Sequence, residues 1–388
     1  MDSLERFVRG KLEQLEARSL KRTLQETDRY AAALARRSGQ EMISFCCNDY
    51  LNLSHHPKLI EATIEATQRY GAGSGASRLV TGNHPLFAEL EGRLSRFKET
   101  EDAVVFGSGY LANVGIIPTL IGPNDLIVAD ELCHACLFAG SQISRAKLEI
   151  FRHNDLDHCA ALLGAHRAKH THCLILTDGV FSMDGDLAPV IELVDLAARF
   201  DAWLMTDDAH GLGVVAGGKG SSFVTGEKAR VPLQMGTLSK AIGVYGGYLC
   251  ASKAVIDFVK TRARSFIYTT GLPPGAVAAC IAALDLIESE PELVARPMQK
   301  ARLFTRALNL PEPESCIVPL ILGDPETALA ASESLAEQGF LVTAIRPPTV
   351  PKDTARLRFT FTAEHEDADI LRLAEAVRPF MANDRDAA

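Results

Sequence analysis

At 388 residues the chain is too long for a single hydrophobic core, because cores stop growing at roughly 250–300 residues. Hydrophobic residues make up 47% and charged residues 23% of the chain, which is typical of a globular protein and excludes general disorder. The net charge of −9 provides no basic surface for nucleic acid, and no apolar stretch approaches the roughly 20 residues that span a membrane. The 9 cysteines are scattered and odd in number, so we expect reduced thiols and a cytoplasmic protein.

Residues 1–22 place apolar side chains at helical spacing among charged ones, which predicts an amphipathic helix. This segment has neither the apolar core nor the small-residue cleavage site of a signal peptide. We expect residues 1–50 to form a helical arm that packs with the C-terminal part of the chain.

The middle of the chain alternates short apolar runs with amphipathic segments. The apolar runs predict buried strands at 104–106, 126–128, 174–176, 203–206 and 248–251. Between them, residues 189–200 have the spacing of an amphipathic helix. This alternation indicates an α/β fold, in which residues 51–286 form a large domain with a mostly parallel sheet covered by helices.

After about residue 286 the pattern changes. Long helical segments at 292–308 and 327–338 alternate with short apolar runs at 317–320, 342–345 and 356–362. This order predicts a smaller α+β domain over residues 287–388.

Reactive residue types follow the predicted strands of the large domain. A glycine turn lies at 107–110, acidic residues and histidines lie at 130–134, 178–182 and 207–210, and a lysine ends the segment 237–240. Ligand-binding groups gather beyond the carboxyl ends of the strands in sheets of this kind. We therefore expect these residues to converge on one edge of the sheet.

Two short motifs in this region are weak signals. Gly107-x-Gly109-x-x-Ala112 fits a dinucleotide fingerprint, but residues 211–216 fit it equally well. The first is better interpreted as a helix N-terminus that can bind any phosphate group. Cys133-x-x-Cys136 has the spacing of metal ligands, but no second cysteine pair or paired histidines accompany it, so no metal site is predicted.

Lys240 and Asp207 are the strongest candidates for chemistry. Lys240 lies among apolar residues and two hydroxyls; it is either a surface lysine or one that loses its proton and forms a Schiff base. Asp207 follows an apolar strand and either caps the next segment or pairs with a protonated heterocyclic nitrogen. Together the two residues match the requirements of pyridoxal 5'-phosphate (PLP).

Five segments resemble the α-oxoamine synthases, in the same order along the chain. They are residues 48–53, 71–78, 178–186, 207–211 and 237–240. The resemblance extends from about residue 4 to about residue 380. It implies the aspartate-aminotransferase fold (fold type I), PLP as cofactor, and condensation of an amino acid with an acyl thioester.

Residues 343–351 and 354–358 are most similar to the family members that use L-alanine and a pimeloyl thioester. The resemblance therefore implies decarboxylative condensation of these substrates in biotin biosynthesis, with pimeloyl-CoA or pimeloyl-acyl carrier protein as acyl donor. Members that condense glycine with an acetyl thioester share residues 178–185 and remain the alternative. A PLP-binding subunit without activity is a further alternative, against which the intact Lys240 argues.

The resemblance also implies roles for the residues around the cofactor. Lys240 would bind PLP and remove the alanine Cα proton, Asp207 would keep the pyridine nitrogen charged, and His134 would stack on the ring. Ser182 and His210 would approach the phenolic oxygen of the cofactor. The phosphate would be held by Ser108, Gly109, Tyr110 and Thr237, with Thr270 of the partner subunit completing the site in a homodimer.

The substrates would be bound by a second set of residues. Asn48, Thr349 and His134 would line the substrate cleft. Arg22 would meet the distal carboxylate of the pimeloyl chain, unless it belongs to an ordinary solvated basic face. Arg356 and Arg358 lie on one face of a predicted strand, and the resemblance selects Arg358 for the alanine carboxylate.

Cys133 and Cys136 depart from the family pattern. The family often has Asn or Ser at the first of these positions and Ser at the second. We interpret both cysteines as inert small residues beside the stacking histidine.

Overall fold

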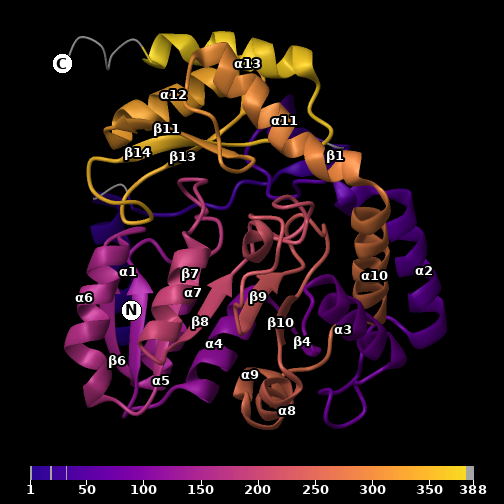
Figure 1. Cartoon of the computed structure of the whole chain (residues 1–388). Helices are drawn as coiled ribbons and strands as arrows, with labels where there is room; N and C mark the ends of the chain where they lie inside the picture. The colour runs from indigo at the N-terminus through magenta and orange to yellow at the C-terminus, as the bar shows by residue number, and fades with distance from the viewer. Residues whose placement is uncertain (1, 18–19, 32, 382–388) are drawn as a thin grey trace.

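The computed structural model describes residues 2–17, 20–31 and 33–381. A seven-stranded sheet forms the centre of the larger part of the molecule (Figure 1). Its strands are, in spatial order, β4 (Asp102–Phe106), β10 (Gly247–Ala251), β9 (Leu233–Thr237), β8 (Trp203–Asp207), β7 (Cys173–Asp178), β5 (Leu126–Asp130) and β6 (Lys147–Phe151).

The strands of this sheet are parallel except for β10, which is antiparallel to both β4 and β9. The connection from β9 to β10, residues 238–246, is shorter than the dozen or more residues that a parallel crossover requires. The predicted mostly parallel α/β sheet is therefore confirmed, and the reversal of β10 follows from the length of its connection.

Helices cover both faces of the sheet, and successive residues of each strand contact different helices. On one face Val104 and Phe106 belong to a core that includes α4 (Gly109–Leu120), α5 (Ala135–Ser144), α8 (Lys253–Arg262) and α9 (Arg264–Ile267). On the other face Ala103 and Val105 pack with α2 (Pro57–Tyr70), α3 (Pro85–Phe97) and α10 (Pro274–Ser289). Further along this face the sheet is covered by α6 (Leu156–His166) and α7 (Val190–Arg199).

A smaller antiparallel sheet lies above the first in Figure 1 and consists of β11 (Ile317–Gly323), β14 (Ala355–Thr360) and β13 (Thr343–Ile345). Its core is shared with α11 (Pro291–Leu308), α12 (Pro325–Glu337) and α13 (Asp367–Met381). Leu357 and Phe359 of β14 point into this core, whereas Arg356 and Arg358 contact the segment 182–184 of the larger part. Side-chain alternation along β14 thus places two buried arginines between the two parts.

The N-terminal segment contains α1 (Ser3–Ala17), β1 (Asp28–Ala31), β2 (Leu34–Arg37) and β3 (Gln40–Ser44). The three strands form a sheet with β12 (Phe340–Leu341), which pairs with β3 in parallel and so ties this segment to the C-terminal part.

The predicted helical arm is wrong for residues 28–31, 34–37 and 40–44, because these residues form strands. The helix also ends at Ala17, so Arg22 lies beyond it in a segment without regular structure; residues 18 and 19 lie outside the described residues. No residue of α1 is buried, and a short helix gains little stability without a packing partner. The domain boundaries near residues 50 and 286 stay a prediction.

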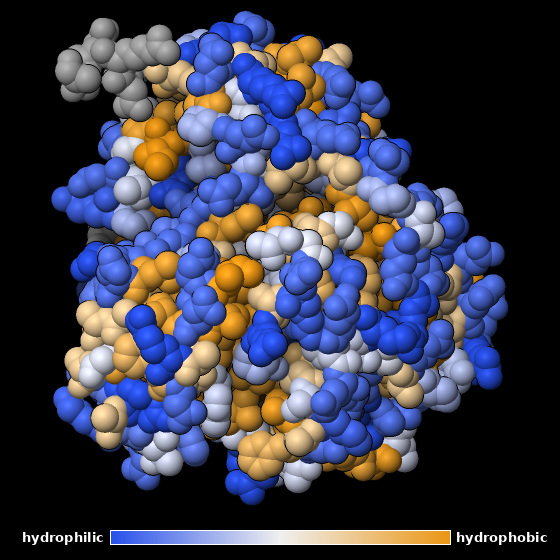
Figure 2. Space-filling view, viewed as in Figure 1, coloured by the Kyte–Doolittle hydropathy of each residue, from blue (hydrophilic) through white to orange (hydrophobic). Residues whose placement is uncertain are grey.

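Hydrophobic side chains gather across the middle of the face shown in Figure 2, where the smaller and larger parts of the molecule meet. Short 3-10 helices at Leu53–His55, Arg167–Lys169 and Ser221–Phe223 complete the described secondary structure. Within the described ranges, we find no helix with the length and apolar character needed to cross a membrane.

Candidate active site

A cavity of about 210 Å³ lies beyond the carboxyl ends of β4, β5, β7, β8 and β9. We call it the inner cavity. Its lining residues are Ser108, Gly109, Tyr110, His134, Cys136, Asp178, Asp207, Ala209, His210, Met235, Thr237, Ser239 and Lys240. The structure thus brings the strand-end residues together on one edge of the sheet, as the sequence predicts.

Lys240 is held in the inner cavity by a histidine. Its Nζ lies 2.7 Å from Nε2 of His210, and Nδ1 of His210 lies 2.6 Å from the hydroxyl of Tyr50. Burial lowers the pKa of Lys240 to about 8, although Asp207 and Asp178 oppose this shift. Burial, and then the charge of Lys240, also hold the pKa of His210 well below its usual value. A lysine with this pKa has a substantial neutral fraction at physiological pH and can act as a nucleophile and a base.

Asp207 is a buried carboxylate with two close donors and a longer contact of 3.9 Å from the thiol of Cys136. Asn113 donates from Nδ2 to one carboxylate oxygen at 2.7 Å, and the backbone N–H of Ala209 donates to the other at 3.0 Å. The neighbouring Asp208 is occupied elsewhere, because it accepts from the fully buried Lys98 at 2.9 Å and from the backbone N–H of Ser221. Asp207 is therefore the carboxylate that faces the cavity, and Asp208 fixes the following loop.

The N-terminus of α4 lies in the wall of the inner cavity, where Ser108, Gly109 and Tyr110 line it. Ser108 caps the helix by accepting from the N–H of Leu111 at 3.1 Å, and no described residue takes the N–H groups of Gly109 and Tyr110. A Cβ atom at Gly247 would lie 2.5 Å from the carbonyl oxygen of Ser108, so only glycine lets β10 support this turn. Free N–H groups at a helix N-terminus favour a bound phosphate.

His134 and its neighbours form the wall of the cavity opposite the sheet edge. The thiol of Cys136 lies 2.7 Å from Nδ1 of His134 and 3.0 Å from Nδ2 of Asn113. Burial lowers the pKa of His134 and raises the pKa of Cys136 to about 12, so Cys136 stays a thiol. Cys136 thus links the histidine to the donor of Asp207, and the inertness of both cysteines stays a prediction.

Asp178 lines the same cavity, and its carboxylate accepts from the backbone N–H of His134 at 3.2 Å. Burial and the charge of Asp207 hold the pKa of Asp178 well above its usual value. Asp178 is therefore a poor candidate for the negative charge that a protonated heterocycle needs.

A second hollow of about 600 Å³ adjoins the inner cavity, and we call it the outer pocket. His134 lines both, and Ser182 and Thr349 line the outer pocket. Its wall is otherwise largely apolar, and the remaining lining residues are Leu132, Cys133, Ala135, Phe138, Phe181, Met183, Pro348, Val350 and Pro351, with the acidic Glu131 and Asp184. Arg22 lies in its lining, is exposed, and has no hydrogen-bond or ion-pair partner among the described residues.

Arg358 and Asn48 lie together, outside the lining of both hollows. The guanidinium of Arg358 lies 3.3 Å from Oδ1 of Asn48 and also donates to the carbonyl oxygen of Ser182. Arg356 is bound to Asp184 and to the carbonyl oxygen of Met183, so it holds the loop rather than facing a substrate. Of the two arginines, only Arg358 contacts Asn48, whose Oδ1 also lies 3.3 Å from the hydroxyl of Tyr50.

Two predicted cofactor ligands lie away from the inner cavity. Ser182 lines the outer pocket only, and its predicted contact with the phenolic oxygen stays a prediction. Thr270 is exposed and forms an isolated bridge with Ser77, so it does not reach the cavity of its own chain.

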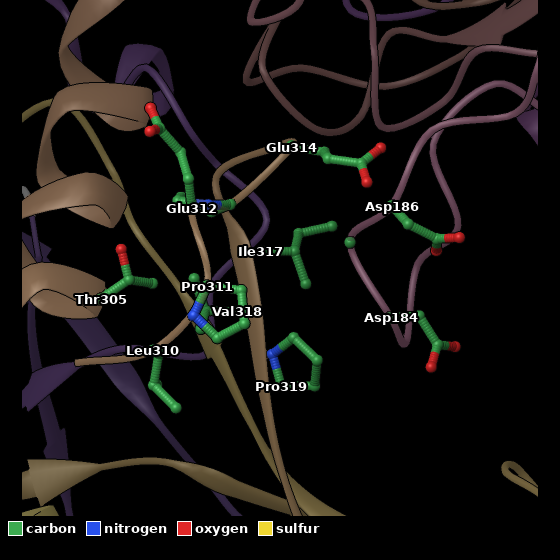
Figure 3. A pocket seen from close by; sticks show the side chains of 12 residues that line it. Asp184, Asp186, Thr305, Leu310, Pro311, Glu312, Glu314, Ile317, Val318 and Pro319 are labelled. Atoms are coloured by element: carbon green, nitrogen blue, oxygen red, sulfur yellow. The ribbon is translucent and has the colours of Figure 1, made fainter. Parts of the chain in front are cut away.

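A further hollow of about 200 Å³ separates the loop 184–186 from the residues before β11 (Figure 3). Its carboxylates are engaged, since Asp186 lies 2.7 Å from Nε2 of His153 and Glu314 accepts from the N–H of Leu187 at 3.0 Å. Across the ranges that the structure describes, no group of three or more His, Cys, Asp or Glu side chains is arranged to hold a metal ion. This hollow is a packing gap beside the loop that Arg356 holds.

Sequence reasoning missed two residues of this site. Tyr50 lies in the segment 48–53 that carries the family resemblance, but no role was assigned to it. Asn113 is a fully buried polar residue within an apolar helix, and this contrast is the signal that identifies it.

The donor set fits PLP, since an amine, a carboxylate and free helix N–H groups line one cavity. Fold and site together define a PLP-dependent enzyme of fold type I. The family model for class I and II aminotransferases matches residues 40–377, and the chain belongs to this family.

Among the relatives, the chain is 66% identical to the 8-amino-7-oxononanoate synthase of Methylocella silvestris, over 88% of this chain and 97% of the relative. Its fold matches a serine palmitoyltransferase from S. paucimobilis that holds PLP and myriocin, with a TM-score of 0.90, 28% identity and 98% of both chains covered. It also matches the 8-amino-7-oxononanoate synthase of Francisella tularensis, with a TM-score of 0.76, 27% identity, and 89% of this chain and 99% of the other covered.

Proposed function

We propose that this enzyme condenses L-alanine with a pimeloyl thioester to give 8-amino-7-oxononanoate, CO₂ and the free thiol, in biotin biosynthesis. The observation that carries the proposal is the outer pocket, which joins the reactive cavity at His134 and has the unpartnered Arg22 in its lining. Its two acidic residues are engaged, since Asp184 pairs with Arg356 and Glu131 accepts from the backbone N–H of His153. A largely apolar pocket with one free arginine suits an apolar acyl chain that ends in a carboxylate. An acetyl group would use neither feature.

Six residues of the inner cavity have a place in this reaction: Gly109, Tyr110, His134, Asp207, Thr237 and Lys240. The N–H groups of Gly109 and Tyr110, with the hydroxyl of Thr237, bind the cofactor phosphate. The negative charge of Asp207, oriented by Asn113, keeps the pyridine nitrogen protonated. PLP, when bound, supplies an electron sink for the charge that develops at the amino acid Cα.

The neutral amine of Lys240 removes the Cα proton of alanine, which its lowered pKa permits near neutral pH. His134 covers the reacting centre where the inner cavity and the outer pocket meet. Arg358 binds the alanine carboxylate, and Asn48 keeps the guanidinium in place until the substrate arrives.

We further propose a homodimer in the cytoplasm, in which Thr270 completes the phosphate site of the partner subunit. The exposed position of Thr270 supports this arrangement, as do the exposed rings of Tyr110 and Tyr268 on the same part of the molecule. The free thiols of all the cysteines suit a reducing compartment. Sedimentation of the purified protein tests the dimer.

The test of the function is thiol release with L-alanine or glycine, each combined with a pimeloyl or an acetyl thioester. We expect the highest kcat/KM for L-alanine with the pimeloyl thioester. Faster condensation of glycine with the acetyl thioester would replace the proposal by the alternative reaction. CoA and acyl carrier protein thioesters of pimelate, compared in the same assay, identify the acyl donor.

A further inference from the structure

A continuous row of polar groups connects Asn48 to Lys240 through the interior. The Tyr50 hydroxyl lies 3.3 Å from Oδ1 of Asn48 and 2.6 Å from Nδ1 of His210. Nε2 of His210 lies 2.7 Å from Nζ of Lys240. Tyr50 is fully buried and His210 is 5% exposed, so water does not compete for the contact between them, whereas Asn48 and Lys240 at the two ends are half-buried.

The row allows two arrangements of its protons. In the first, Tyr50 donates to Nδ1 of His210; the single proton of the neutral imidazole is then on Nε2 and is donated to a neutral Lys240 amine. In the second, a charged Lys240 donates to Nε2 of His210, and the imidazole proton moves to Nδ1. Tyr50 must then accept from Nδ1 and turn its own proton towards Asn48.

The geometry favours the first arrangement. In the first arrangement the contact of 2.6 Å is donated by the Tyr50 O–H, and in the second by the Nδ1–H of His210, whose bonds to oxygen are usually about 2.7–3.2 Å long. The second arrangement adds only the long contact of 3.3 Å between the Tyr50 hydroxyl and Asn48. Oδ1 of Asn48 also faces both terminal nitrogens of Arg358, at 3.3 and 3.4 Å, so it already has donors. Hydrogen bonds near 3.3 Å are weaker than those near 2.7 Å.

We propose that Tyr50 is a positioning residue that fixes the Nε2–H tautomer of His210 and thereby holds Lys240 in its neutral, reactive form. The other titratable or charged groups that face Lys240 are Asp207, Asp178, Arg358, Cys136 and His134, and they are common to both arrangements. The inference rests on the proposed function only for the role of Lys240 in proton transfer.

The first experiment titrates Lys240 in the full-length chain freed of PLP. The rate at which acetic anhydride labels Lys240 is followed against pH by peptide mass spectrometry. In the unsubstituted protein we expect the midpoint near the pKa of about 8. In Tyr50→Phe, Nε2 of His210 is free to accept from the ammonium form, so the midpoint rises by roughly half a unit to one unit and labelling at pH 8 slows about two- to fivefold.

Tyr248→Phe is the matched control. Tyr248 is also fully buried, but its hydroxyl has no partner among the described residues, so its removal leaves the midpoint of Lys240 unchanged. The proposal is overturned if Tyr50→Phe titrates like Tyr248→Phe.

A second measurement needs no substitution. In protein with ¹⁵N-labelled histidine, the ring nitrogen shifts of His210 should report the Nε2–H tautomer. A resonance pattern of the Nδ1–H tautomer would overturn the proposal even if Tyr50→Phe does not fold. Both experiments omit substrates and PLP, so a failure of the condensation assay does not alter their outcome.

Discussion

The inner cavity and the outer pocket meet at His134 but are built differently. The reactive groups of the inner cavity follow regular strands, and its central residues Asp207 and His210 are buried and hydrogen-bonded. The outer pocket is lined mainly by irregular segments, with Ala135 and Phe138 of α5 as the exceptions, and its one arginine is exposed and unpartnered among the described residues.

This difference indicates that the inner cavity carries out the reaction and that the outer pocket selects the acyl substrate. Groups at the ends of paired strands are held in place before any ligand binds, which is what electrostatic stabilisation of a reaction requires. Irregular segments tolerate changes of length and residue type, which suits the recognition of one acyl chain among several. Substitutions in the inner cavity should therefore reduce kcat, and substitutions in the outer pocket should raise KM for the thioester.

Lys240→Ala should produce the largest effect. Loss of the base should lower kcat by more than about 10³-fold, because general acid–base catalysis contributes roughly 10²–10⁴-fold. Borohydride reduction of the PLP-loaded protein, followed by peptide mapping, should place the label on Lys240. Lys219→Ala is the control, since Lys219 is paired with Glu99 at the surface. A label on Lys219 or Lys253 would exclude Lys240 as the cofactor lysine.

Asp207→Asn should lower kcat by about a hundredfold or more, because it removes the charge that keeps the pyridine nitrogen protonated. The fold should persist, since the amide has the same shape as the carboxylate. Asp208→Asn is the contrasting variant: it leaves the buried Lys98 without its counter-ion and should lower the melting temperature instead. Near-normal turnover in Asp207→Asn would show that another group supports the pyridine nitrogen.

Arg358→Ala tests a residue that lines neither the inner cavity nor the outer pocket but is proposed to bind the alanine carboxylate. Its side chain is 6% exposed, and charge-assisted hydrogen bonds are worth about 1.5–3 kcal/mol each, so we expect KM for L-alanine to rise roughly tenfold to a hundredfold. Arg356→Ala, two residues earlier on the same face of β14, frees Asp184 and should lower stability rather than alanine affinity alone. If KM for L-alanine changed equally in Arg358→Ala and Arg356→Ala, Arg358 would have no specific role in binding the alanine carboxylate.

The inner cavity could be predicted from the sequence because strand ends are easy to locate. The apolar runs before Asp207 and His134 predict buried strands, and the parallel arrangement then places the following residues on one edge. The strands β6 and β9 were not predicted, because β6 carries charged residues and β9 contains Gln234 and a glycine. Tyr50 and Asn113 act through other side chains, and no local pattern shows such a contact.

The outer pocket was much harder to predict. Arg22 and Thr349 are more than 300 positions apart, and neither lies in a regular element, so no periodicity relates them. The strands β1, β2 and β3 were missed because they are short and partly exposed, and the pairing of β3 with β12 is a long-range contact. Only the family resemblance pointed to Arg22, and the structure then placed it in the lining of the pocket.

Arg22→Ala should have the smallest effect and is the sharpest test of the outer pocket. An ion pair at an exposed arginine contributes little, so we expect KM for the pimeloyl thioester to rise only about two- to fivefold, with KM for L-alanine unchanged. A heptanoyl thioester has the same chain length but no distal carboxylate, so Arg22→Ala should not alter its KM. Lys21→Ala is the matched control, since Lys21 is an equally exposed neighbour that pairs with Glu16. If Arg22→Ala changed KM for both thioesters equally, or for neither, Arg22 would not bind the distal carboxylate, and the pocket would recognise only the apolar part of the acyl chain. Selection of the substrate would then have to arise within the inner cavity.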